Sequence, residues 1–194
     1  MWLKQIEPPA ETPVTLAEAK ANLRYSASDQ DAFIAGLIAA AVGHLEGRNG
    51  ILGRSLVTQT WETRLERFPC RYNGRIELPM PPLQSVQSIK YLDAAGDEQT
   101  VDPATYIVDE QHLIGRVRLA PGKTWPATLC DEAAVRIRFV AGYGNAAAVP
   151  APLKQAILLL VGHWWLNREA VGQAGGPHAF AVEALTQQFK VVPV

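Results

Sequence analysis

Cysteine and histidine are scarce in this chain of 194 residues, and the few that occur are far apart. The two cysteines, Cys70 and Cys130, fit no CxxC or Cys/His spacing, and we interpret them as ordinary reduced thiols. The four histidines form neither an HExxH motif nor an i, i+4 pair. The sequence therefore predicts no disulfide framework, no metal site and no cofactor.

Long apolar runs and an excess of one charge are also missing. The longest apolar run, Ala156 to Val161, is far shorter than the roughly 20 residues that span a bilayer. The first residues, MWLKQIEPPAET, lack the basic and apolar regions of a signal peptide. A formal net charge of −1 gives no overall electrostatic argument for nucleic acid or an anionic membrane. We therefore expect a protein made in the cytoplasm that has no membrane partner.

Signatures of catalysis are absent as well. The sequence contains no GxSxG motif, no Walker loop and no GxGxxG. The carboxylates Asp93, Asp97, Glu98 and Asp102 cluster around a predicted hairpin, a pattern more typical of a solvated loop than of an acid/base pair. We predict no catalytic residues and a protein that is not an enzyme. A small enzyme with an unrecognised site is kept as an alternative.

The most informative pattern runs from Ala134 to Arg168. Val135, Ile137 and Phe139 alternate with polar residues, which predicts a half-buried strand. Two glycines and a proline pair follow, and then a helix is predicted over 152–168. Its apolar residues recur at helical spacing and are Leu153, Ile157, Leu160, Val161 and Trp164. A helix this apolar is expected in the middle of a core or packed on two sides.

The remaining segments complete a prediction of an α+β fold. Helices are expected over 15–24 and 29–48, the first opened by a Thr15/Glu18 capping box. Strands within 54–143 predict a central, mainly antiparallel sheet, and the three helices are expected to form a bundle. We assign residues 15–170 to a single domain. Residues 1–14 are interpreted as an extended arm, and residues 171–194 as a flexible hinge with an extended tail.

Three motifs resemble one known group of proteins. The strand ending in AGYG, the helix LKQAILLLVGHWWLNRE and the N-terminal segment TLAEAKANLR are similar to those of head–tail connector (adaptor, head-completion) proteins of tailed bacteriophages and gene transfer agents. The resemblance implies a structural subunit of the virion neck, one of twelve in a ring under the portal. Its implied partners are other copies of the chain, the portal protein and the next tail-side connector or stopper. DNA would pass through the channel without sequence recognition.

Two sets of candidate interface residues follow from this resemblance and from the residue types. The apolar tail residues are expected to bind the portal. They are Phe180, Leu185, Phe189, Val191, Val192 and Val194. Trp165, Arg136 and Arg138 are candidates for the contact between subunits.

The arginines leave further readings open. If the strands near 116–118 and 136–138 are neighbours, Arg116, Arg118, Arg136 and Arg138 form a basic stripe. Such a stripe could be a solvent face balanced by nearby acids, or it could contact a subunit or DNA. A non-viral scaffolding or toxin-associated binding module with the same fold also remains an alternative.

Overall fold

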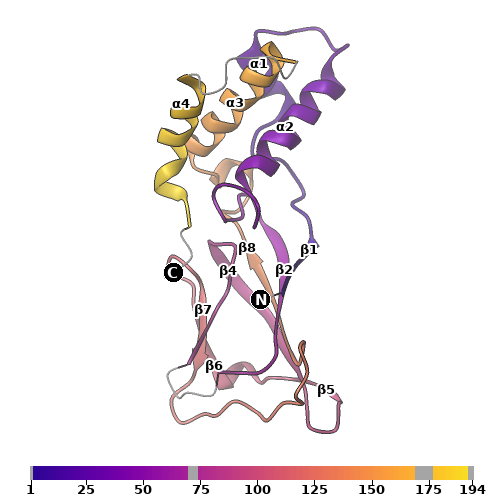
Figure 1. The fold of residues 1–194 in the computed structure, drawn as a ribbon, viewed down its shortest axis with the longest axis vertical. Helices are drawn as coiled ribbons and strands as arrows, with labels where there is room; N and C mark the ends of the chain where they lie inside the picture. The colour runs from indigo at the N-terminus through magenta and orange to yellow at the C-terminus, as the bar shows by residue number, and fades with distance from the viewer. Residues whose placement is uncertain (1, 70–73, 169–176, 192–194) are drawn as a thin grey trace. The chain divides into compact units, whose positions relative to one another are not determined.

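The computed structural model describes residues 2–69, 74–168 and 177–191. The chain forms two compact units, and each contains segments that are distant in the sequence (Figure 1). The first, which we call the sheet unit, comprises Met1–Ala10 and Thr58–Tyr143. The second, the helical unit, comprises Glu11–Val57 and Gly144–Val194. Each unit is therefore built from two separate stretches of the chain, and a stretch of the other unit lies between them in the sequence.

The sheet unit contains two antiparallel sheets. The larger has the strand order β1-β2-β8-β4-β5, and the smaller has the order β3-β7-β6. The strands are β1 (Trp2–Glu7), β2 (Gln59–Leu65), β3 (Arg75–Glu77), β4 (Leu83–Leu92), β5 (Glu98–Thr100), β6 (Tyr106–Asp109), β7 (Arg116–Leu119) and β8 (Val135–Ala141), with a short 3-10 helix, η1 (Pro103–Thr105). Strand β8 is central in its sheet and pairs with β2 on one side and β4 on the other.

One face of the larger sheet forms the core of this unit. Val135, Ile137 and Phe139 of β8 are fully buried, as their alternation predicts. They belong to one apolar cluster with Ile76 of β3 and Val117 of β7. The core thus draws on both sheets, and the opposite face of β8 carries the polar residues. The predicted hairpin of β4 and β5 is also confirmed.

The helical unit is built around its third helix. Its elements are α1 (Leu16–Leu23), α2 (Asp31–Leu45), η2 (Ala146–Ala148), α3 (Ala151–Leu166), α4 (Pro177–Thr186) and η3 (Gln187–Phe189). Helix α3 packs against α1, α2 and α4, so its wide apolar surface has partners on several sides (Figure 1). The predicted α+β fold class is confirmed.

Two details of the helical prediction need correction. Leu160 is only half-buried, whereas Ile157 and Val161 are fully buried, so the core side of α3 is rotated away from Leu160. The sequence Ser28-Asp-Gln-Asp31 also predicts a capping box at the start of the second helix, but this box does not form: Gln30 is the N-cap and makes no side-chain capping hydrogen bond. The Asp31 carboxylate instead accepts a hydrogen bond from Lys20 at 2.6 Å. In the described part of the chain, no helix has the length and apolar character needed to cross a membrane.

The described parts of both chain ends include helices or strands. Residues 2–7 of the expected extended arm are an edge strand that pairs with β2 and has one register shift, between Gln5 and Glu7, and Pro8 and Pro9 follow the paired residues. The extended tail predicted after the hinge is wrong over 177–189, where the chain is helical. Pro177 occupies the first helical position, where a missing N–H has no cost, and Val182 and Thr186 lie one turn apart on a buried side. The predicted hinge around Gly175 lies outside the described residues.

The capping box that opens α1 gives a direct test of local stability. The Thr15 hydroxyl accepts a hydrogen bond from the Glu18 N–H, while the Glu18 carboxylate accepts one from the Thr15 N–H at 2.7 Å. We expect Thr15→Ala to lower the free energy of unfolding by about 1 kcal/mol, and Thr15→Ser to have little effect. Urea denaturation of both variants measures this, and equal stability of Thr15→Ala and the parent would contradict it.

The same box should make α1 sensitive to acid. Hydrogen bonds from the Thr15 backbone and hydroxyl lower the pKa of the Glu18 carboxyl. A carboxyl whose pKa is lower in the folded chain stabilises the fold at higher pH, and this contribution is lost as the pH falls through the lowered pKa. The stability difference between the parent and Glu18→Gln should therefore shrink on acidification.

Candidate interaction surfaces

Among the described residues, no group of three or more His, Cys, Asp or Glu side chains could hold a metal ion. One hollow in the sheet unit lies beside the rings of Phe68 and Trp125, which stack 4.5 Å apart. Its described lining residues include no carboxylate, histidine or cysteine. These observations direct attention to surfaces that bind other molecules.

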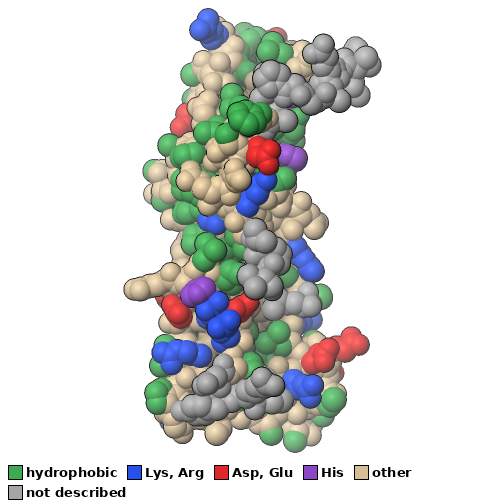
Figure 2. All heavy atoms as spheres, turned by 60° about the vertical axis from the view of Figure 1, so that its left-hand side comes forward, with side chains coloured by type: hydrophobic (Ala, Val, Ile, Leu, Met, Phe, Trp, Pro, Cys, Tyr) green, Lys and Arg blue, Asp and Glu red, His purple; other side chains and the backbone are tan. Residues whose placement is uncertain are grey.

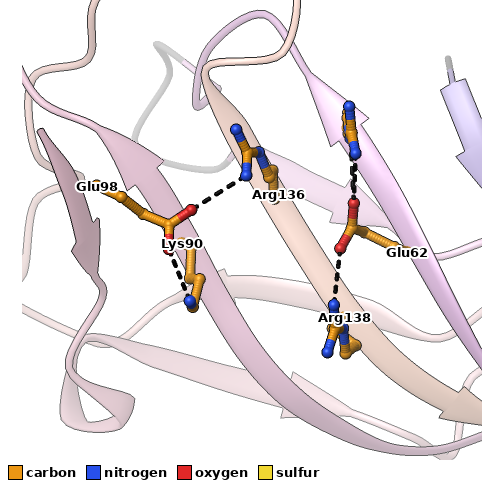
Figure 3. Close-up of polar contacts among 6 residues, drawn as sticks. Glu62, Lys90, Glu98, Arg136 and Arg138 are labelled. Atoms are coloured by element: carbon orange, nitrogen blue, oxygen red, sulfur yellow. Dashed lines mark hydrogen bonds and ion pairs between the residues drawn. The ribbon is translucent and has the colours of Figure 1, made fainter. Parts of the chain in front are cut away.

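The outward face of the larger sheet carries a network of ion pairs. In Figure 3 the Glu98 carboxylate lies between Lys90 and Arg136, at 2.7 and 3.1 Å. The Glu62 carboxylate lies between Arg138, at 3.3 Å, and Arg64, at 3.0 Å. Each carboxylate is shared by two cations, so the network has more positive than negative charge.

Strand register extends this network across the sheet. Arg136 of β8 lies opposite Arg64 of β2 on one side and Lys90 of β4 on the other. On the edge strand β1, Lys4 lies opposite Glu62, and paired residues of neighbouring strands point to the same face. We call this surface the basic face and define it by five cations and three carboxylates: Lys4, Arg64, Lys90, Arg136 and Arg138, with Glu7, Glu62 and Glu98.

Burial differs among the charged groups of the basic face. The side chain of Glu62 is 9% exposed and that of Glu98 is 39% exposed, while Arg138 and Lys90 are each 45% exposed. The hydrogen bond from Lys90 lowers the pKa of the Glu98 carboxyl, with a further contribution from the charge of Arg136. The Glu98 carboxyl is thus held as an anion by two cations of the basic face.

The structure separates the four arginines that were candidates for one stripe. Arg116 and Arg118 lie on β7, in the smaller sheet, while Arg136 and Arg138 lie on β8, in the larger one. Arg116 forms its ion pair with Glu77, at 3.3 Å. The condition for a stripe of all four arginines, that the two strands are neighbours, is therefore not met, since strands that follow one another in sequence need not share a sheet. Lys4, Arg64 and Lys90, which the sequence reasoning missed, join Arg136 and Arg138 instead.

Trp165 belongs to an aromatic cluster within the helical unit. Its ring lies 5.1 Å from the ring of Tyr25 and 5.9 Å from that of Phe33, measured between centroids. The Arg168 guanidinium lies over both Trp165 and Phe33, at 4.7 and 4.6 Å. Phe33 is still 38% exposed and the neighbouring Leu166 is 79% exposed. Trp165 is thus partly covered by its own unit, and the cluster retains exposed apolar surface.

The predicted portal-binding residues divide into three groups. Phe180 on α4 is 77% exposed. Leu185, Phe189 and Val191 are half-buried, with the Arg54 guanidinium 5.9 Å from the Phe189 ring and the Val191 N–H donating to the Leu52 carbonyl at 2.9 Å. Val192 and Val194 lie outside the described residues. The segment from 177 to 191 is therefore attached to its own unit and offers Phe180 as its most exposed aromatic side chain.

Figure 2 agrees with this distribution. Hydrophobic side chains are visible at several places on this side of the molecule, interspersed with charged and other polar groups. The apolar candidates for a contact are thus separate anchors such as Phe180 and Leu166. Anchors of this kind suit an assembly in which each subunit makes several limited contacts.

Comparison with known proteins adds a decisive likeness. Neither a protein-family model nor a curated protein matches the chain. Among solved structures, a chain in the neck of an empty gene transfer agent (GTA) particle, computed with C6 symmetry, is 28% identical with a TM-score of 0.80. A chain in the virion of the native GTA particle is 27% identical with a TM-score of 0.78. A chain in the neck of the native GTA particle, computed with C12 symmetry, is 25% identical with a TM-score of 0.73.

These similarities extend over the whole molecule. In all three cases the match covers 100% of this chain and 97% of the other. Both units and the C-terminal helices are therefore part of the shared structure. The likeness to a structural neck component of a gene transfer agent particle is therefore confirmed.

Proposed function

We propose that this protein is a head–tail connector, or adaptor, subunit in the neck of a phage or gene transfer agent particle. It forms a ring beneath the portal and joins the DNA-filled head to the tail. The observation that carries the proposal is the full-length similarity to chains in the neck of a gene transfer agent particle. The protein acts by binding other proteins and has no catalytic role.

The ring is supported by symmetry and by surface chemistry. The related neck structures were computed with C6 and C12 symmetry, which fits a ring in which the number of copies is a multiple of six, such as twelve. A closed ring needs two different surfaces on each subunit that fit one another. We assign the aromatic cluster around Trp165 to one of these contacts, because exposed aromatic and arginine side chains together are typical of interface anchors.

We assign the C-terminal segment to the portal contact, with Phe180 as its main anchor. The other end of the ring would receive the next tail-side connector. Portal and connector contacts repeat in every subunit, so modest single contacts add to a lasting attachment. DNA passes through the ring's channel.

Reconstitution of the neck tests this function. Purified protein should bind to DNA-filled heads that carry a portal but lack this protein, and electron microscopy should show an added ring at the portal vertex. Tails should then join these heads and not untreated heads. A protein that stays monomeric and leaves the heads unchanged would contradict the proposal.

Phe180→Ser tests the assigned portal contact. Because the side chain is 77% exposed, its removal should leave the stability of the isolated protein nearly unchanged. Burial of a Phe side chain by a partner contributes about 1.5–3 kcal/mol, so each subunit should bind roughly tenfold or more weakly without it. Binding to portal-bearing heads measures the loss.

Ala184→Ser is the matched control, since it introduces the same residue at another exposed position of α4. It should bind heads like the parent. Equal binding by Phe180→Ser and Ala184→Ser would show that the portal contact lies elsewhere.

A further inference from the structure

We propose that the basic face of the larger sheet binds the phosphate backbone of DNA. This inference rests on the proposed function, because a neck ring surrounds the DNA that leaves the head and so brings the protein and DNA together. It goes beyond the proposed function by naming the surface that contacts the DNA and the chemistry of the contact. The contact would be independent of base sequence, because cations that meet phosphates carry no information about the bases.

The first support is the segregation of charge. The whole chain has 18 basic and 19 acidic residues, a nearly even balance. The basic face has five cations and three carboxylates, so the rest of the chain is acidic on balance. Positive charge is thus concentrated on one side of one sheet, although the net charge of the sequence conceals it.

The second support is the cost of the arrangement. Arg64, Arg136 and Lys90 lie directly opposite one another on three neighbouring strands. Like charges at opposite positions destabilise a sheet, and strands lie only about 4.8 Å apart. Two carboxylates relieve part of this repulsion, but they are shared among four cations. A row of cations that weakens the fold is best explained by an anion that it meets.

The third support comes from Lys4 and Trp2 on the edge strand. Among the described residues, Lys4 has no ion-pair partner, and its side chain is exposed. The Arg64 guanidinium lies 3.9 Å from the centroid of the Trp2 ring, which holds this arginine at the surface. Lys4 and the Trp2–Arg64 pair extend the positive surface to the edge of the sheet.

The composition of the face favours DNA over an acidic protein. The centre of a protein–protein interface is usually depleted of charged residues and rich in apolar ones. Protein–DNA interfaces are more polar and much more positive. On the basic face, charged residues occupy the centre, and the large exposed apolar residue, Trp2, lies at the edge.

A salt titration of DNA binding tests the proposal on the full chain. The probe is a fluorescently labelled 30-base-pair duplex, and anisotropy gives the affinity at several salt concentrations. Each phosphate contact contributes about −0.9 to the slope of log K against log salt. The double variant Lys4→Gln/Arg138→Gln should therefore flatten the slope by roughly 2, and weaken binding at low salt by about tenfold for each lost contact.

The control is Lys123→Gln/Arg118→Gln, which removes the same charge from two exposed positions outside the basic face. It should bind the duplex nearly like the parent. Equal losses in both double variants would overturn the proposal, because binding would then depend only on net charge. Circular dichroism confirms that each variant is folded.

Two further measurements separate this inference from the proposed function. If polyglutamate competes with the duplex as effectively as unlabelled DNA does at equal charge, the face binds an acidic protein and the proposal is wrong. Binding of Lys4→Gln/Arg138→Gln to portal-bearing heads should be normal. Normal DNA binding with lost head binding would overturn the DNA assignment while leaving the neck function intact.

Discussion

Phe139→Ala should lower the free energy of unfolding of the sheet unit by about 3–5 kcal/mol. Phe139 is fully buried on β8, the central strand of the larger sheet, and it faces core residues of both neighbouring strands. Trp61 lies opposite it on β2 and Val86 opposite it on β4. Replacing the ring by a methyl group leaves a cavity. The neighbouring side chains are held in place by paired strands and cannot move in to fill it, so the apolar contacts of the Phe139 ring are lost.

Amide hydrogen exchange of the native protein measures the loss of stability within the sheet unit. Amides of β2, β4 and β8 should exchange faster in the variant by the factor that corresponds to its lost stability. Val140→Ala is the matched control, because Val140 is the next residue on the same strand and is only partly buried. A Phe139→Ala protein with the protection of the parent would show that the core lies elsewhere.

The elements that sequence analysis predicted well are those whose signal is local. Alternation marked β8, and the Thr15/Glu18 box marked the start of α1, because both patterns act within a few residues. The stripe on α3 identified a core helix, although it misplaced Leu160. An apolar residue at helical spacing can lie at the margin of a buried face, and only the positions of α1, α2 and α4 decide which residues are covered.

The basic face could not be predicted in the same way. Its cations come from β1, β2, β4 and β8, and residue 4 becomes a neighbour of residue 62 only through the pairing of β1 with β2. A net charge of −1 gave no indication of it. Sequence reasoning identified Arg136 and Arg138 by their alternation but paired them with the wrong strand. Register and strand order are properties of the folded chain, and no local pattern determines them.

The C-terminal segment shows why apolar residues near a chain end have two readings. Sequence reasoning assigned Phe189 and Val191 to a partner, because no periodic neighbour was visible. In the structure, the chain's own residues 52 and 54 meet them. Phe180 remains exposed, so the segment both covers its own unit and presents an anchor. Helix α4 thus has a buried side that covers its own unit and an exposed side that carries Phe180, where we propose the portal contact.

Deleting residues 181–194 should destabilise the helical unit by roughly 2–5 kcal/mol, because the deletion removes buried as well as exposed groups. Burial of Val182 contributes about 1.5–3 kcal/mol. The Val191–Leu52 hydrogen bond adds about 0.5–1.5 kcal/mol. The contact between Arg54 and Phe189 adds about 0.5–1 kcal/mol. Urea denaturation, with hydrogen exchange of α2 and α3, measures the loss.

Comparison with Phe180→Ser separates the two roles of the segment. The truncated protein should lose both stability and binding to portal-bearing heads, whereas Phe180→Ser should lose binding alone. Val182→Ala is the complementary variant, because Val182 is only 7% exposed. This variant should be less stable than the parent but should still bind portal-bearing heads, because Phe180 is retained. If the truncated chain were as stable as the parent, α4 would not be part of the core of the helical unit. If Val182→Ala reduced head binding as strongly as Phe180→Ser does, without a loss of stability, Val182 would face the portal and the assignment of the two sides of α4 would be reversed.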